Sequence, residues 1–312
     1  MVILRLGKCH VTCNMRQWCR RPSQTPFGRT HSDLSGGTGS GRLVDVSDSP
    51  IPDVKVLSMS NPPANVLSLA MLEDIMASIA KLCDPQKSLC RGLVLTSAVP
   101  NIFSVGFDLH SLYAAQDYET FAVYWRQVQK LYVTLNTLPV PLVAAINGSA
   151  TGFGCILALS ADYRVMAEGS SSCTAPYKIG LDFVQSGLTV PPCFAAVVVH
   201  TVGHRNCEAL FQLGELHVAH AAREMGLIDE TVESADEVLV HALDMGEKLS
   251  DAPPWSFWVV KDALRKELVS PLCTEALRAA DCSNFYEFLK NQEVHRDLGK
   301  FLARGGHLQS SK

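Results

Sequence analysis

Two glycine-bearing segments of this 312-residue chain have the residue types and spacing of turns that present backbone N–H groups to a ligand. They are residues 103–109 (FSVGFDL) and residues 145–155 (AINGSATGFGC). Each follows an apolar run typical of a β-strand, residues 92–96 and 141–146, and precedes a stretch of helical character. The first N–H groups of a helix have no partner within it, so both turns have donors to offer. Two such turns that converge on one carbonyl oxygen would stabilise the negative charge of a developing enolate.

Further motifs occur in order around the two turns: residues 61–69 (NPPANVLSL), 161–164 (ADYR), 203–205 (GHR) and 225–229 (MGLID). With them the chain resembles the crotonase (enoyl-CoA hydratase/isomerase) superfamily, and within it the mitochondrial 3,2-trans-enoyl-CoA isomerases, also called dodecenoyl-CoA isomerases. The resemblance runs from about residue 54 to about residue 302. It implies a protein of fatty-acid β-oxidation that moves the double bond of an acyl-CoA from the β,γ to the α,β position.

The elements that must position the turns fit an α/β fold. Alternating or continuous apolar runs predict strands over residues 54–60, 93–96 and 142–146, and helical periodicity predicts helices over residues 69–82, 118–138 and from 154 to 159. From about residue 209 the pattern is mostly helical, with helices expected over residues 207–213, 235–249, 254–267 and 274–288. The resemblance implies a crotonase-like ββα spiral core over residues 46–205 and a helical C-terminal region, residues 206–312, that packs in a homotrimer or a hexamer.

Composition limits the classes of function. The chain is 47% hydrophobic and 19% charged, enough to bury a large core, and no apolar run reaches the length of a membrane span. A net charge of −4 gives no reason to expect nucleic acid as a partner. The eleven cysteines are scattered, without a C-x-x-C pair, and His217 and His220 have no third ligand nearby in the sequence. We therefore expect no metal.

The N-terminal segment differs from the rest of the chain. Its first 32 residues contain several arginines and no acidic residue; the first acid is Asp33. An arginine-rich, acid-free start is typical of a transit peptide, with a disordered basic tail as the alternative interpretation. We expect residues 1–45 to be a transit peptide and a flexible, glycine- and serine-rich linker, and the mature protein to lie in the mitochondrial matrix.

The resemblance assigns the oxyanion donors to the backbone N–H groups of Phe107 and Phe153. Phenylalanine at both positions is unusual, because the family prefers smaller residues there. The two rings either narrow or shorten the acyl channel or pack into the core. The same resemblance expects substrate contacts from residues on and around both turns: Ala64, Val66, Ser104, Val105, Gly106, Asp108, Leu109, Gly152 and Gly154.

The catalytic carboxylate that the resemblance predicts is missing. Ile156 stands where hydratases carry their first glutamate, and an apolar residue there is the habit of isomerases. Phe183 stands where both enzymes carry the other glutamate, and Gly180 before it and Gly187 after it fix the alignment. A proton shuttle between two carbons needs a base within hydrogen-bond reach.

Three explanations of the missing glutamate stay open. Asp182, one position earlier, is a candidate base, although aspartate also favours turns and caps. A carboxylate from elsewhere could enter the pocket, either Asp108, Glu119 or Glu168, of which Asp108 is also placed to cap the following helix. The third explanation is a protein that binds acyl-CoA, or assembles with active relatives, without isomerising it.

The sequence says less about the CoA moiety. The phosphates require Lys or Arg at the mouth of the pocket, and Lys55, Arg91, Lys178 and Lys261 are the candidates. No Walker-type or dinucleotide glycine pattern occurs, so we expect no cofactor beyond the CoA of the acyl-CoA thioester.

Overall fold

The structure is a computed structural model that describes residues 42–84, 89–115, 117–171, 173 and 175–306. Its main sheet has six strands in the order β1-β2-β4-β7-β9-β12. β1 is antiparallel to β2, and the other neighbours are parallel. Every residue of β4 and β7 is buried, as expected for central strands of a parallel sheet that is covered on both faces. The strands are Val44–Asp48 (β1), Val54–Met59 (β2), Gly92–Ser97 (β4), Leu142–Ile146 (β7), Tyr163–Gly169 (β9) and Glu230–Ser234 (β12).

A second, four-stranded sheet in the order β11-β10-β8-β5 and a parallel strand pair β3-β6 complete the ββα spiral. The chain passes from β7 directly into β8 and then α4, and from β4 into β5, β6 and α2. Each passage turns the chain from the main sheet into the smaller sheets before a helix begins, so both glycine turns lie at one end of the main sheet. The strands are Val66–Leu67 (β3), Asn101–Ser104 (β5), Gly106–Phe107 (β6), Gly148–Thr151 (β8), Lys178–Gly180 (β10) and Leu216–Val218 (β11).

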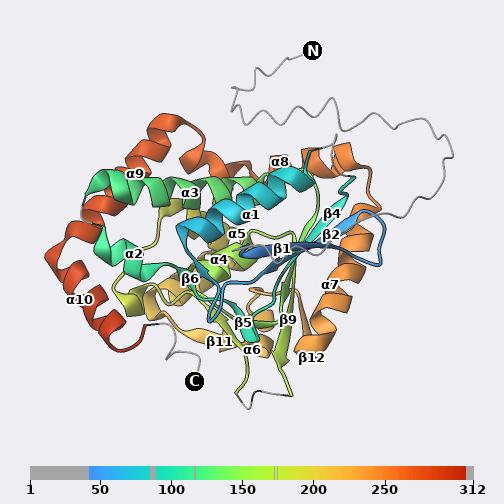
Figure 1. Cartoon of the computed structure of the whole chain (residues 1–312), viewed down its shortest axis with the longest axis horizontal. Helices are drawn as coiled ribbons and strands as arrows, with labels where there is room; N and C mark the ends of the chain where they lie inside the picture. The colour runs from blue at the N-terminus through green and yellow to red at the C-terminus, as the bar shows by residue number, and fades with distance from the viewer. Residues whose placement is uncertain (1–41, 85–88, 116, 172, 174, 307–312) are drawn as a thin grey trace.

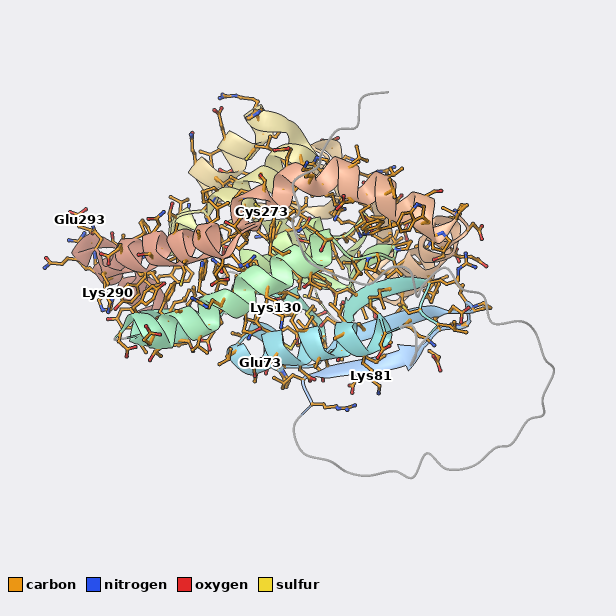
Figure 2. The ribbon with its side chains drawn as sticks, turned by 90° about the horizontal axis from the view of Figure 1, so that it is seen from above. Glu73, Lys81, Lys130, Cys273, Lys290 and Glu293 are labelled. Atoms are coloured by element: carbon orange, nitrogen blue, oxygen red, sulfur yellow. The ribbon has the colours of Figure 1, made fainter. Side chains whose placement is uncertain are left out.

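Helices cover the main sheet and extend away from it. α7 packs against β4, β7 and β9, as Figure 1 shows on one side of the sheet. Viewed from above, α3 lies between α1 and α9 (Figure 2). The helices are Leu69–Leu82 (α1), Leu109–Ala114 (α2), Tyr118–Asn136 (α3), Phe153–Leu159 (α4), Pro192–Leu213 (α5), Ala219–Glu224 (α6), Ala235–Ser250 (α7), Pro254–Val269 (α8), Glu275–Lys290 (α9) and Gln292–Ala303 (α10), with 3₁₀ turns at Val184–Ser186 (η2) and Ser270–Leu272 (η3).

Most predicted elements are present with nearly the predicted bounds. α1 begins after Ser68, whose hydroxyl accepts the N–H of Met71 at 3.3 Å, and ends at Leu82 as predicted. The C-terminal part corrects three expectations. The helix predicted from residue 207 begins at Pro192 and is kinked at Gly203. β11 and β12 interrupt the expected helical region, and α10 was not predicted.

β12 is an edge strand of the main sheet and pairs with β9, so the region after residue 206 contributes to the core. The expected boundary at residue 205 lies inside α5, two residues after its kink; the division of the chain into two regions stays a prediction. Residues 1–41 of the expected transit peptide and linker lie outside the part of the chain that the structure describes. β1 begins at Val44, inside the expected linker. In the described part of the chain, no helix is both long and apolar enough to cross a membrane.

Candidate active site

The two glycine turns meet. Gly106 has φ +86°, and a Cβ added to it would lie 2.6 Å from the backbone nitrogen of Phe153 and 3.0 Å from that of Gly154. Any side chain at position 106 would therefore displace the start of α4, in addition to the strain of a positive φ. The N–H of Phe107 follows Gly106 directly, so the two predicted oxyanion donors come from backbone segments in contact.

Hydrogen bonds of the Asn65 and Ser104 side chains fix the conformation of the first turn. Asn65 has φ +48°, and its side-chain amide donates to Ser97 Oγ at 2.7 Å and to the carbonyl of Phe103 at 3.0 Å. The hydroxyl of Ser104 donates to the carbonyl of Asn65 at 2.8 Å and accepts the N–H of Gly106 at 3.1 Å. Both side chains are fully buried, so their hydrogen bonds are expensive to break and fix the turn firmly.

The second turn depends on its own glycines. Gly152 precedes α4 with φ +54°, and its N–H donates to the carbonyl of Gly180 at 3.0 Å. A Cβ on Gly154 would lie 2.2 Å from the carbonyl oxygen of Ser104, so only glycine allows this approach of the two turns. The N–H of Phe153 belongs to the first residue of α4, where the helix supplies no acceptor. The backbone nitrogens of Phe107 and Phe153 thus belong to two turns in contact, and their role as a pair of oxyanion donors stays a prediction.

Asp182 lies beside the second turn. Its Oδ1 is 3.2 Å from the position of a Cβ on Gly152, and only 4% of the residue is exposed. The backbone carbonyl of Asp182 accepts the N–H of Gln185 at 3.1 Å at the start of η2, so the residue also has the turn role that its type favours. Burial first, and then the charge of Asp182, raise the pKa of the Cys155 thiol, so that thiol stays protonated.

Of the other candidate carboxylates, one caps a helix and two are exposed. Asp108 caps α2: it accepts the N–H of Ser111 at 3.0 Å through Oδ1 and the hydroxyl of Ser111 at 2.7 Å through Oδ2. Glu119, in the first turn of α3, and Glu168, near the end of β9, are both exposed. Asp108 belongs to the first turn, but its side chain caps α2; of the four carboxylates considered from the sequence, Asp182 is the one that lies buried beside Gly152.

Aromatic rings fill the space around the turns. The rings of Phe107 and Phe153 stack with centroids 4.6 Å apart and an interplanar angle of 14°. The ring of Phe183, at the position of the missing glutamate, lies 5.9 Å from that of Phe107, and the ring of Phe194 lies 5.0 Å from that of Phe153. All four residues are at most 4% exposed. Position 183 therefore does face the site, with an apolar ring in place of a carboxylate.

The remaining predicted contact residues surround the first turn. The N–H of Val105 donates to the carbonyl of Ala64 at 3.2 Å, and Val66 pairs with Gly106 across β3 and β6. Leu109 is the buried first residue of α2. One residue that sequence reasoning missed is Tyr124, whose hydroxyl accepts the N–H of Asp108 at 3.2 Å and donates to the carbonyl of Leu67 at 3.0 Å. Only its place on the buried face of α3 could have suggested it.

The basic residues suggested for the CoA phosphates fare differently. The prediction that Lys261 could bind a CoA phosphate at the mouth of the pocket is wrong, because the residue is only 5% exposed and its Nζ lies 2.6 Å from Asp162 Oδ2. Lys55 pairs with Asp48, and Arg91 donates to the carbonyl of Ser250. Lys55 is the second residue of β2, and Arg91 directly precedes β4. Both lie at the end of the main sheet away from the turns, because the turns follow the carboxyl ends of β4 and β7.

The fourth basic residue, Lys178, begins β10, whose Gly180 pairs with Thr151 of β8 one residue before Gly152. It is the candidate of the four that the fold places near the turns. Thr151 itself was not singled out from the sequence. Its hydroxyl is buried without a hydrogen-bond partner among the described residues.

A spiral of ββα units whose glycine turns meet in this way defines a protein of the crotonase fold. Residues 52–307 match the sequence profile of the enoyl-CoA hydratase/isomerase family, so the chain belongs to that family. It is 37% identical to mitochondrial enoyl-CoA delta isomerase 1 of Mus musculus over 251 residues, which is 80% of this chain and 83% of that protein. It is 33% identical to the Homo sapiens protein of the same name over 294 residues, covering 93% of each chain.

A solved structure agrees. The crystal structure of human mitochondrial delta3-delta2-enoyl-CoA isomerase superposes with a TM-score of 0.78 at 32% identity, over 86% of this chain and 99% of that one. The expected crotonase-like α/β fold is therefore confirmed, and the chain is homologous to enoyl-CoA delta isomerases. The roles of the individual site residues stay predictions.

Proposed function

We propose that this chain binds an enoyl-CoA at the two glycine turns and moves its double bond from position 3 to position 2-trans, in mitochondrial β-oxidation of unsaturated fatty acids. The observation that carries the proposal is the contact between the turns, where a Cβ on Gly106 would touch the nitrogen of Phe153. The names of the similar mouse and human isomerases support it.

In this mechanism the thioester carbonyl oxygen accepts the N–H groups of Phe107 and Phe153. As a proton leaves the carbon next to the carbonyl, negative charge moves onto that oxygen, and two fixed donors stabilise it by several kcal/mol, on the order of 3 for each donor. Asp182 is the base that takes the proton and returns it two carbons further along the chain. Its carboxylate is buried beside Gly152, next to the oxyanion donor of Phe153.

A second function, acyl-CoA binding without turnover, is favoured by one observation. Phe183 faces the ring of Phe107 at 5.9 Å from the position where the family carries its glutamate. Under this alternative the turns still hold the thioester, and no group removes the proton.

Isomerisation of 3-hexenoyl-CoA, followed through the absorbance of the conjugated product, separates the two functions. We expect turnover by the parent chain and a loss of about 10²-fold or more in Asp182→Asn, because an amide cannot accept the proton. Glu168→Gln, which removes an exposed carboxylate, is the matched control and should leave the rate unchanged. An inert parent that binds the thioester would establish the second function. An active parent with an unchanged Asp182→Asn rate would show that Asp182 is not the base.

The protein's setting is part of the same proposal. We place it in the mitochondrial matrix, in line with the mitochondrial relatives, and as a homotrimer or a hexamer that needs no cofactor beyond the CoA of its substrate. α8 supports an assembly, because Trp255, Val260 and Leu264 are each at least half exposed along one helix.

A further inference from the structure

Each of the two turns carries a buried phenylalanine ring beside its predicted oxyanion donor. Each proposed oxyanion donor is the N–H of a phenylalanine, so each ring begins two bonds beyond the Cα next to the donating nitrogen. The rings of Phe107 and Phe153 stack at 4.6 Å, which means that both side chains project to the same side of the paired turns. Phe183 packs on that stack at 5.9 Å from the ring of Phe107. The three side chains closest to the donors thus converge in one volume.

Further rings continue this stack away from the turns. The ring of Trp125 lies 5.5 Å from that of Phe107, and the ring of Phe285 stacks on Trp125 at 4.1 Å and 9°. The rings of Phe107, Trp125 and Phe285 form an aromatic column. The ring of Phe194 packs on its side, with its centroid 5.0 Å from that of Phe153 and 6.4 Å from that of Trp125. Each of these residues is at most 4% exposed, so the column is packed against protein along its length.

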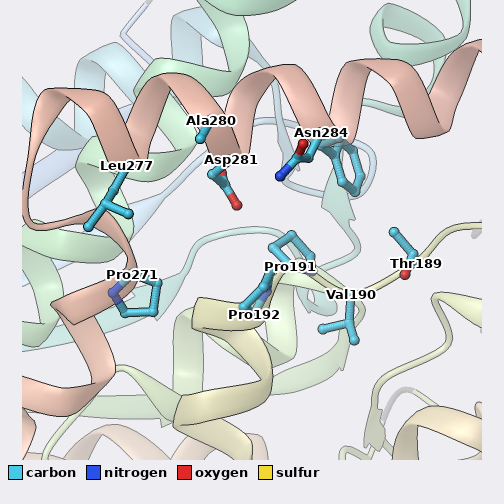
Figure 3. A pocket seen from close by; sticks show the side chains of 10 residues that line it. Thr189, Val190, Pro191, Pro192, Pro271, Leu277, Ala280, Asp281 and Asn284 are labelled. Carbon is cyan, nitrogen blue, oxygen red and sulfur yellow. The ribbon is translucent and has the colours of Figure 1, made fainter.

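A pocket of about 340 Å³ lies at the far end of the column. Phe285 is part of its lining, and Figure 3 shows Leu277, Ala280 and Asp281 of α9 facing Pro191 and Pro192 across it. The pocket is apolar over most of its wall and is the size of a medium-length acyl tail. The rings of Phe107 and Trp125 separate it from the turns.

We propose that Phe107 and Phe153 determine acyl-chain length: they admit a short acyl group and keep longer chains out of the path to the pocket beside α9. The inference rests on the proposed function, because it requires the thioester to bind at the two turns. In this arrangement a chain of few carbons would end before the stacked rings, and a longer chain would meet the buried column. Dense packing of this kind does not yield to one more methylene without moving a ring.

The experiment is calorimetric binding of butyryl-CoA and lauroyl-CoA to the full chain and to Phe107→Leu. Leucine keeps the backbone N–H and removes the ring. We expect the parent to bind butyryl-CoA at least about tenfold more tightly than lauroyl-CoA, and Phe107→Leu to reduce or reverse that ratio by a similar factor. Phe121→Leu is the control, since Phe121 is equally buried in the same aromatic cluster and packs on Trp125 and Phe285. It should leave the ratio unchanged.

Each other outcome overturns the inference in a recognisable way. Equal or tighter binding of lauroyl-CoA by the parent would contradict the length limit and leave the proposed function intact. An unchanged ratio in Phe107→Leu, or the same change in Phe121→Leu, would remove the specific role of Phe107. Binding of neither thioester would refute the proposed function itself. If Phe107→Leu does not fold, as judged by its thermal transition, Phe153→Leu is measured in its place with the same expectation.

Discussion

At the scale of single residues, the predicted oxyanion donors are backbone groups, whereas the predicted base is a side chain. The donors are backbone groups, so phenylalanine at positions 107 and 153 leaves the N–H groups in place. At position 183, where the resemblance predicts a glutamate, the chain has a buried phenylalanine ring beside Phe107. Asp182 is adjacent in sequence and lies beside Gly152, but its side chain leaves the backbone one residue earlier.

Phe183→Glu tests whether the turns can still support the chemistry. Combined with Asp182→Asn, which removes the proposed base, it should raise isomerisation of 3-hexenoyl-CoA by about 10²-fold over Asp182→Asn alone, because a positioned carboxylate contributes about that much. The same change buries a carboxyl group at a site that is 4% exposed, so thermal stability should fall and the pKa of the new carboxyl should rise. Phe183→Gln, equal in size but unable to accept the proton, is the control. Equal rates of Phe183→Glu and Phe183→Gln in the Asp182→Asn background, although both bind acyl-CoA, would contradict this interpretation.

At the scale of elements, the sequence predicted the parts with strong local signals. α1 has a cap at Ser68 and a clear apolar period, and its bounds agree with the prediction. β7 is a continuous apolar run, and its bounds agree as well. β12 was missed because four of its five residues, ETVES, are polar, and the strand is specified by its pairing with β9. The start of α5 was missed because the helix is kinked at Gly203.

In the candidate site too, the local features were predicted from the sequence, and the features that depend on contacts between distant segments were not. The glycine turns are local features, and both were recognised from their residues. The aromatic column was not, because Phe107, Trp125, Phe194 and Phe285 come from four segments far apart in the chain. Lys261 was misjudged for the same reason: its partner Asp162 is distant in sequence, and nothing local marks the lysine as buried.

At the scale of the whole molecule, a buried ion cluster fastens α8 to the core. Asp162, after α4, lies 2.6 Å from Nζ of Lys261 and 3.0 Å from Nη2 of Arg265 and accepts the N–H of Leu142 at 2.8 Å. Burial lowers the pKa of Lys261 to about 8, against the opposing effect of Asp162. The charge of Arg265 also lowers the pKa of Lys261, whereas Cys83, at the end of α1, raises it.

This lysine makes stability depend on pH. Below pH 8 the ammonium is charged in both the folded and the unfolded chain. Between about pH 8 and its ordinary value of 10.5, the unfolded chain holds a proton that the folded chain has released, so stability contributed by this group rises with pH. The total effect is about 3 kcal/mol at most. We expect the free energy of unfolding, measured in urea from pH 7.5 to 10, to rise more steeply in the parent than in Lys261→Met. Parallel curves would contradict the assignment.

The most direct test of the central claim asks whether the two turns stabilise an enolate, without depending on any base. Acetoacetyl-CoA ionises to an enolate that absorbs in the near ultraviolet, and two oxyanion donors should lower the pKa of the bound thioester. We predict that enolate absorbance at pH 7 rises when the chain binds acetoacetyl-CoA. Gly106→Ala should lose the signal, because its Cβ would lie 2.6 Å from the nitrogen of Phe153 and displace that donor. Bound acetoacetyl-CoA without enolate absorbance in the parent, or an equal signal in Gly106→Ala, would contradict the account.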